Sequence, residues 1–148
     1  MKKLLLLAIV TISMISCSKS ESSESSTDKI VGKWVITSAT IQNGANGTPS
    51  NSLQACQTLG NLIFTSTTIS TGNTIQTSYY PNATTSACEI QPVQYSTWSN
   101  IGNNTYNITY SGMTGVDVLN ITFINNDRTM LMVANDGVYI IKSIFAKQ

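Results

Sequence analysis

The chain has 148 residues, of which only 10% are charged, and its 8 basic residues nearly balance its 7 acidic ones. This length supports one domain with one core, and the near-neutral charge argues against nucleic-acid binding, which needs a basic face. The chain contains no histidine, which removes the commonest general base, the Ser-His-Asp triad and most zinc sites.

Residues 1–16 have the pattern of a secretory signal peptide. Lys2 and Lys3 give a positive start, and an apolar stretch over 4–12 follows. This stretch is too short to cross a bilayer core as a helix, so cleavage is favoured over a membrane span. It ends in the residues SMISC over 13–17, which resemble the lipobox of bacterial lipoproteins.

That resemblance implies cleavage before Cys17, followed by acylation of Cys17 with palmitate-type chains. The alternative is ordinary secretion, with Cys17 discarded or left free. Several acyl chains hold a protein at a membrane stably, where one chain binds only marginally. The expected location is therefore the bacterial cell envelope, anchored by lipid at the outer membrane and facing either the periplasm or the outside.

Residues 17–28 are predicted to form a flexible tether after the acylated cysteine. They are rich in serine, contain Glu21, Glu24 and Asp28, and hold no large apolar residue after Cys17. Such a segment cannot bury surface. Its acidic residues loosely resemble the surface-export signals of Bacteroidota lipoproteins, and the folded domain is expected over 29–148.

Strand patterns dominate residues 29–148. Tyr106, Ile108 and Tyr110, for example, alternate with polar residues at a period of two. Eight strands are predicted, over 34–41, 62–66, 74–80, 93–98, 106–110, 119–123, 130–134 and 138–145. Turn signals at 71–73, 100–104, 111–112, 125–127 and 135–137 separate them, and the one short helical turn is expected near 53–59. These features predict an all-β protein, an eight-stranded antiparallel up-and-down β-barrel, because closure removes exposed strand edges.

The residues Val31-Gly32-Lys33-Trp34, at the start of the first strand, resemble the Gly-x-Trp signature of lipocalins. With the two later cysteines, the strand end Thr97-Trp98-Ser99 and the turn Gly102-Asn103, residues 29–148 resemble the lipocalin-like domains of Bacteroidota lipoproteins. The resemblance implies a barrel that binds a small hydrophobic ligand, with Gly32 and Trp34 as its signature residues.

In lipocalins an arginine near the last strand packs over that tryptophan. The last strand here offers Lys142 and Lys147 instead, and the only arginine of the chain is Arg128. In an up-and-down meander Trp34, Arg128 and the chain end fall at the same, closed end of the barrel. We therefore expect Arg128 to cover Trp34.

Cys56 and Cys88 are the two cysteines that remain if Cys17 is acylated. An oxidising compartment and an even count favour a disulfide, against the alternatives of two buried thiols or a two-thiolate metal site. In a meander the first loop (42–58) and the third (81–92) share one end, so the bridge is topologically allowed. It would pin the long first loop, which serves lipocalins as a lid over the open mouth.

Large inward side chains decide whether the barrel is hollow. They either line a ligand cavity or fill a small barrel solid, because about eight strands leave an interior just wide enough for side chains. The residues predicted to take one of these two roles are Phe64, Tyr106, Ile108, Tyr110, Leu119, Ile121 and Phe123.

Catalysis is disfavoured. Of the acidic residues Glu89, Asp117, Asp127 and Asp136, the last two flank one strand and lie too far apart to cleave a glycoside together, and turn formation explains both. No phosphate loop, nucleophile elbow or calcium loop is present in the sequence. We expect a non-enzymatic protein without metal or cofactor. Its partners would be the membrane and a small hydrophobic ligand, or alternatively an envelope or host protein bound by a filled barrel that acts as an interaction or inhibitor module.

Overall fold

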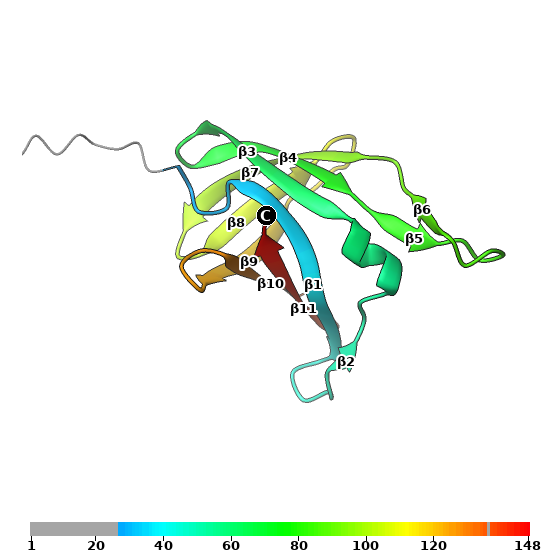
Figure 1. The fold of residues 1–148 in the computed structure, drawn as a ribbon. Helices are drawn as coiled ribbons and strands as arrows, with labels where there is room; N and C mark the ends of the chain where they lie inside the picture. Colours follow the sequence, from blue (N-terminus) through cyan, green and yellow to red (C-terminus); the bar gives the residue numbers. More distant parts are fainter. Residues whose placement is uncertain (1–26, 136) are drawn as a thin grey trace, which may run out of the picture.

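The computed structural model describes residues 27–135 and 137–148, which form a closed antiparallel β-barrel (Figure 1). The signal peptide at 1–16, the lipidation site Cys17, most of the predicted tether and Asp136 lie outside the described residues. No helix in the described part of the chain is long and apolar enough to cross a membrane.

Eight strands build the barrel wall, as predicted. They are β1 (Gly32–Asn43), β3 (Asn61–Thr68), β4 (Thr71–Thr77), β7 (Gln94–Gly102), β8 (Thr105–Tyr110), β9 (Asp117–Ile124), β10 (Thr129–Asn135) and β11 (Tyr139–Lys147). Each pairs with the next along the chain, and β11 closes the barrel by pairing with β1, where Phe145 lies opposite Ile36. Closure pairs the first and last strands of the wall with each other, which removes the two long free edges of an open sheet.

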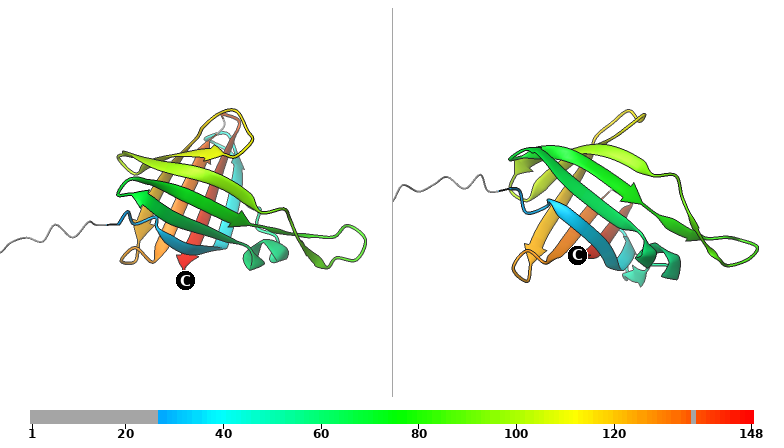
Figure 2. Two further views of the ribbon diagram at one scale, coloured as in Figure 1. Left: turned by 90° about the horizontal axis from the view of Figure 1, so that it is seen from above. Right: turned by 45° about the horizontal axis from the view of Figure 1, so that its top comes forward.

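One end of the barrel carries additional short elements. The strand β2 (Ser50–Asn51) folds back on the second half of β1, and the 3-10 helix η1 (Ala55–Leu59) forms where a short turn was predicted. The predicted strand over 74–80 is divided, because the chain leaves the barrel after β4 and enters β5 (Tyr79–Pro81), which pairs with β6 (Cys88–Ile90). Figure 2 shows this β5–β6 hairpin projecting from the barrel, away from the end where residues 27–29 lie.

The core lies inside the barrel and forms one cluster of buried side chains. Its buried members are Ile30, Trp34, Phe64, Trp98, Tyr106, Ile108, Leu119, Ile121, Met130 and Phe145. Residues 27–148 therefore contain every barrel strand, this core and both cysteines of the disulfide described below, so they form one folding unit.

Gly72 was expected in a turn, and this expectation is wrong. It lies within β4, opposite Trp98 of β7, and the indole Nε1 of Trp98 donates a hydrogen bond across it to the Thr65 carbonyl at 2.9 Å. A glycine inside a strand often marks a close approach of another group. Here the missing side chain makes room for the tryptophan ring.

Replacing Gly72 by alanine is expected to lower the free energy of unfolding by about 2 kcal/mol or more, as overpacking does in a close-packed core. The added Cβ would lie 1.7 Å from the Thr65 carbonyl oxygen and 2.5 Å from Trp98 Nε1. Urea unfolding measures the change. Gly44→Ala is the control: an added Cβ there meets no atom, and only its left-handed φ of 63° opposes the change, at about 1 kcal/mol. Equal losses in the two variants would contradict this packing role.

The cation over Trp34 is Lys147, so the expectation for Arg128 is corrected. Lys147 Nζ lies 5.1 Å from the centre of the Trp34 ring, within the range of a cation–π contact. The lysine chain crosses Gly32, where an added Cβ would lie 2.6 Å from Lys147 Cε. Arg128 contributes its backbone carbonyl, which accepts a hydrogen bond from the Lys147 amide at 2.9 Å. The signature glycine therefore leaves space for the side chain that covers the signature tryptophan.

Candidate functional site

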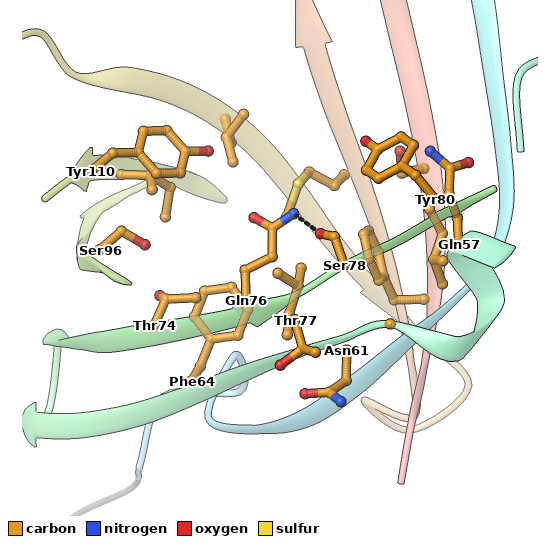
Figure 3. Close-up of a pocket in the computed structure, with 18 residues that line it drawn as sticks. Gln57, Asn61, Phe64, Thr74, Gln76, Thr77, Ser78, Tyr80, Ser96 and Tyr110 are labelled. Atoms are coloured by element: carbon orange, nitrogen blue, oxygen red, sulfur yellow. Dashed lines mark hydrogen bonds between the residues drawn. The ribbon is translucent and has the colours of Figure 1, made fainter. Parts of the chain in front are cut away.

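A cavity of about 270 Å³ occupies the end of the barrel that carries η1 and the β5–β6 hairpin (Figure 3). Seven of its lining residues are aliphatic side chains, methionine or phenylalanine: Ile36, Leu62, Phe64, Ile108, Leu119, Met132 and Phe145. The others are small or polar: Gln57, Gly60, Asn61, Thr74, Gln76, Thr77, Ser78, Tyr80, Ser96, Tyr110 and Ser143. A concave site with an apolar lining and a few polar groups is the usual form of a small-molecule site.

The opposite end of the barrel is filled. Trp34, Trp98, Ile121 and Met130 are almost completely buried there, and the ring of Trp34 lies 5.9 Å from that of Phe123. Ile30 closes this end of the barrel, and its carbonyl accepts a hydrogen bond from Trp34 Nε1. The barrel is thus solid over one half and hollow over the other.

The seven residues predicted to face inward divide between these halves. Those that line the cavity are Phe64, Ile108, Tyr110 and Leu119. Those that lie in or beside the filled end are Tyr106, Ile121 and Phe123. The two alternatives for the interior, a cavity or a solid core, each describe one half of the barrel.

Asp28, the last residue of the predicted tether, binds the filled end. Its carboxylate accepts hydrogen bonds from the Tyr106 hydroxyl at 2.8 Å and from Asn100 Nδ2 at 2.6 Å. It also accepts one from the Ile30 amide at 3.0 Å. These bonds fix the chain where it enters the barrel, and the sequence alone gave no sign of them because Asp28 follows a serine-rich acidic segment.

The pKa of Tyr106 is raised by burial, and further by its hydrogen bond to the Asp28 carboxylate and by the charge of that group. The folded protein therefore holds the tyrosine proton more tightly than the unfolded chain, which releases it near pH 10. Below about pH 10 the ionisation of Tyr106 should not change the free energy of unfolding. Above that pH the free energy of unfolding should fall, by up to about 1.4 kcal/mol per pH unit.

The measurement is the free energy of unfolding between pH 8 and pH 11 for the wild type and for Tyr106→Phe. The variant should be less stable than the wild type at neutral pH, because Asp28 loses a hydrogen-bond donor. Its stability should then fall less steeply in alkali. Parallel pH dependences in the two proteins would show that Tyr106 does not carry this effect.

The cavity wall is built in register across four neighbouring strands. Phe64 on β3 lies opposite Thr74 on β4, Thr74 lies opposite Ser96 on β7, and Ser96 lies opposite Tyr110 on β8. Directly opposed residues of an antiparallel pair point to the same face of the sheet. The four side chains therefore form one belt on the inner surface, with two hydroxyl-bearing residues, Thr74 and Ser96, between two rings.

One member of this belt has an unsatisfied polar atom. Thr74 is 4% exposed and its Oγ1 has no hydrogen-bond partner, whereas Gln76, two residues along, donates to the Ser78 hydroxyl at 3.1 Å (Figure 3). Asn61 Oδ1, at the edge of the cavity, is likewise buried without a partner. Buried polar atoms are normally paired, so the unpaired oxygens of Thr74 and Asn61 are exceptions within the residues that line this cavity. Sequence reasoning missed Thr74 because it looked for large apolar side chains only.

The mouth of the cavity is shaped by the disulfide that the sequence predicted. Cys56 in η1 is bonded to Cys88 in β6, with their Cα atoms 5.3 Å apart. The bond ties the 3-10 helix to the hairpin, and each carries a residue that lines the cavity, Gln57 and Tyr80. β1 pairs with β3 only as far as Trp34, so these elements border the opening that remains between the two strands.

The eighteen lining residues include none with a charged side chain. The carboxylate of Asp117, the first residue of β9, hydrogen-bonds Tyr110 of this wall. Burial raises the pKa of Tyr110, and the charge of Asp117 and its hydrogen bond to Tyr110 raise it further, so the phenol stays neutral at physiological pH. The cavity is therefore suited to uncharged molecules.

Within residues 27–135 and 137–148, the acidic side chains do not gather into a reactive site. Glu89 accepts a hydrogen bond from Asn82 within the hairpin, Asp127 pairs with Lys29 at 3.2 Å on the outside of the filled end, and Asp136 lies outside the described residues. Across residues 27–135 and 137–148, no three His, Cys, Asp or Glu side chains are grouped so that they could hold a metal ion.

Comparison with known proteins gives a family match. The model of the lipocalin-like domain family matches residues 30–131. A search of curated proteins finds no match. Among solved structures, a redesigned β-barrel is similar with a TM-score of 0.46 and 12% identity, over 81% of this chain and 92% of that chain. The family match covers most of the barrel, including the signature residues Gly32 and Trp34. The chain belongs to the lipocalin-like domain family.

Proposed function

We propose that this protein is a lipid-anchored binding protein of the bacterial cell envelope that holds a small, largely hydrophobic ligand in its barrel without catalysing a reaction. The observation that carries the proposal is the half-filled interior. One end is packed by two tryptophans, and the other holds a cavity of about 270 Å³. A barrel required only as a rigid scaffold would gain stability by filling that space, because residual cavities destabilise.

The chemistry of the cavity supports binding rather than catalysis. Its lining lacks carboxylates, lysines and thiols, and its polar groups are hydroxyls and amides. Such groups orient a ligand but are weak acids and bases at neutral pH. This distribution is what a carrier needs, since specificity then comes from shape and hydrogen bonding.

The proposal on location rests on the sequence before the barrel. The lipobox-like residues 13–17 support acylation at Cys17, and the chain reaches the filled end of the barrel at Asp28. The open mouth lies at the other end, beside the disulfide. A protein held by its filled end would keep the mouth free for exchange of ligand with the surroundings.

Lipid attachment is tested by expressing the full chain and its Cys17→Ala variant in a bacterial host. The wild type should partition into the detergent phase, and mass spectrometry of its N-terminal peptide should show a diacylglycerol group on Cys17. The variant should keep its signal peptide and lack the lipid. A wild-type chain that is cleaved without any acyl group on Cys17 would disprove the anchor.

Ligand binding is tested with residues 27–148 expressed in an oxidising compartment. Native and denaturing mass spectra are compared, and an added mass that is lost on denaturation shows an occupied cavity and gives the ligand class. Filling the cavity by Ser96→Leu should abolish that mass while leaving the fold intact, and the exposed Thr97→Leu is the matched control. A bare protein that also takes up no added apolar compound would contradict the proposal.

A second function, as an interaction module, is favoured by one observation. Large apolar side chains are exposed on and near the hairpin at the mouth: Leu59, Tyr80, Ile90, Val93 and Tyr95. Exposed apolar side chains that gather into one large patch mark protein contact sites in other proteins. If the cavity binds nothing, this surface is the next place to search for a partner.

A further inference from the structure

We propose that the filled end of the barrel is a lipid-binding surface, which lies against the anionic headgroups of the membrane to which the chain is anchored. This inference rests on the proposed lipid anchor and goes beyond it, because it assigns residues of the folded barrel to membrane contact. It also gives the barrel an orientation, with the mouth of the cavity directed away from the bilayer. Exposed apolar side chains and clustered positive charge are the two features that carry it.

Three hairpin turns at the filled end each have a large apolar side chain exposed in or next to the turn. The turns join β3 to β4, β7 to β8 and β9 to β10, and Figure 2 shows them at the end of the barrel where residues 27–29 lie. The side chains are those of Ile69, Ile101 and Ile124, which are 64%, 57% and 47% exposed. Single exposed apolar residues are common on protein surfaces. An isoleucine at each of three turns instead gives one end of the barrel an apolar rim, of the kind that meets a partner or a membrane.

Printed contacts hold these turns next to the segment where the chain enters the barrel. The amide of Asn100 donates a hydrogen bond to the Ser70 carbonyl at 2.7 Å, which joins the end of β7 to the turn that contains Ile69. The ion pair between Lys29 and Asp127, at 3.2 Å, joins the entry segment to the β9–β10 turn. The apolar rim therefore borders the point from which the tether leaves.

Positive charge gathers at the same end. Among the basic residues at 27–135 and 137–148, Lys142 lies midway along β11, and the filled end holds the other four: Lys29, Lys33, Arg128 and Lys147. Of the acidic residues in these ranges, Glu89 and Asp117 lie toward the mouth, and Asp28 and Asp127 lie at the filled end. Four positive and two negative groups give the filled end a net charge of +2. The rest of the described barrel has one positive and two negative groups, a net charge of −1.

Part of this positive charge is free to meet a lipid headgroup. Lys33 and Arg128 are exposed, and neither forms an ion pair with another residue of the part that the structure describes. The carboxylates of this end are already engaged, Asp28 by its hydrogen bonds at the barrel entrance and Asp127 by Lys29. Each lysine or arginine near an anionic membrane surface adds roughly five-fold to the affinity.

The length of chain before the barrel keeps this end close to the bilayer. Asp28 follows Cys17 by eleven residues, a distance of at most about 40 Å even for a fully extended chain. Between them, Lys19, Glu21 and Glu24 have a charge of −1, which leaves the sum with the filled end positive. A short tether raises the effective concentration of an attached surface to the millimolar range, so a weak affinity is enough for contact.

The experiment measures how residues 27–148 sediment with lipid vesicles. Vesicles of equal parts phosphatidylcholine and phosphatidylglycerol are compared with vesicles of phosphatidylcholine alone, at millimolar lipid and physiological salt. The wild type should bind the anionic vesicles more than about ten-fold more tightly, because two free cations meet the surface.

Two charge variants show which cations meet the lipid. Lys33→Gln combined with Arg128→Gln should lower the affinity for anionic vesicles about twenty-fold, roughly five-fold for each charge. Lys142→Gln is the matched control, since it removes an exposed cation from the middle of β11. Its effect should be about two-fold or less, because salt screens a charge that lies more than about 8 Å from the surface.

Two apolar variants test the rim in the same way. Ile69→Ser combined with Ile101→Ser should lower the affinity for anionic vesicles about ten-fold, because less apolar surface enters the headgroup region. The matched control combines Leu59→Ser with Ile90→Ser, which removes two similarly exposed apolar side chains near the mouth and should leave the affinity unchanged. Circular dichroism and urea unfolding show whether each variant keeps the fold.

Each outcome gives a decision. Losses in the filled-end variants without losses in their controls would support the lipid-binding surface. A wild type that does not sediment with either kind of vesicle at millimolar lipid would overturn it, since the tether supplies no higher concentration. Equal losses in the filled-end and mouth variants would overturn the assignment to the filled end. Equal binding to both kinds of vesicle would overturn the role of charge.

Failure of this inference is distinguishable from failure of the proposed function. Residues 27–148 do not contain Cys17, so the vesicle measurements do not depend on acylation. A chain without an acyl group would overturn the anchor and leave the affinity of the barrel for anionic vesicles in place. An acylated chain whose barrel does not bind vesicles would overturn the lipid-binding surface and leave both the anchor and the ligand cavity standing.

Discussion

Replacement of Trp34 by alanine is expected to lower the free energy of unfolding by about 3–5 kcal/mol, the usual cost of removing a large buried aromatic side chain. Trp34 is 0% exposed, its ring packs on Phe123 at 5.9 Å, and its Nε1 donates to the Ile30 carbonyl. The variant leaves that carbonyl unpaired and a cavity at the filled end. Urea unfolding followed by circular dichroism measures the loss, because the change removes one of the two tryptophans.

The matched control is Tyr95→Ala, which removes an aromatic side chain from the exposed face of β7. Tyr95 is 58% exposed, so its removal should cost about 1 kcal/mol or less. Similar losses at the two positions would show that burial at the filled end does not determine stability.

The cation–π contact between Lys147 and Trp34 is tested separately. Lys147→Met keeps the chain that crosses Gly32 and removes the ammonium, so it should cost about 0.5–1 kcal/mol and change the fluorescence of Trp34. Arg128→Ala should leave that fluorescence unchanged. The reverse result would restore the original expectation that Arg128 covers the ring.

The second large effect is expected from the disulfide. Replacing Cys56 and Cys88 together by alanine should lower the free energy of unfolding by roughly 3.5 kcal/mol, because the bond closes a loop with a sequence separation of 32 residues. The loss should match that caused by reducing the wild type. Urea unfolding with and without reductant measures both, and the double variant should not respond to reductant.

The position of the bond predicts where the loss begins. It links η1 to β6 outside the barrel wall, so amide hydrogens of η1 and of the β5–β6 hairpin should exchange faster in the double variant, while those of β8 and β9 keep their protection until global unfolding. Uniformly faster exchange throughout the barrel would show that the bond supports the whole fold rather than the mouth.

The half-filled barrel explains how one small domain can be both stable and hollow. The aromatic cluster of Trp34, Trp98, Tyr106 and Phe123 concentrates packing at the end where the chain enters. The other end relies on the disulfide instead of side-chain volume. Dense packing lies at one end of the barrel and the cavity at the other. The cavity therefore leaves room for a ligand without exposing the core that holds the strands together.

Much of the fold could be predicted from the sequence because it depends on local patterns. The period-two alternation around Tyr106 and Tyr110 predicts a strand wherever it lies in the protein. The turn at 125–127 was predictable from its residue types. Asn125, Asn126 and Asp127 all adopt positive φ, which asparagine and aspartate tolerate. The pairing of Cys56 with Cys88 was favoured by the even cysteine count and the expected oxidising compartment, and the alternation of loops between the two ends of a meander allowed it.

Other features depend on contacts between distant residues. Phe64 and Tyr106 are both predicted to point into the barrel, yet one lines the cavity and the other packs in the filled end. Their heights along the barrel are set by strand register and tilt, which no local pattern records. The sequence around Gly72 predicts a turn, and only the pairing of β4 with β7 brings Gly72 opposite Trp98.

The sequence by itself thus determined the fold class, the strands and the disulfide, all of which follow from local periodicity, turn chemistry and the cysteine count. Only the tertiary structure decided that Lys147 covers Trp34, that Asp28 binds Tyr106, and that the Thr74 oxygen is buried without a hydrogen-bond partner. The physical reason is that a hydrogen bond or a cavity depends on where several strands bring their side chains together. That position is a property of the closed barrel rather than of any single strand.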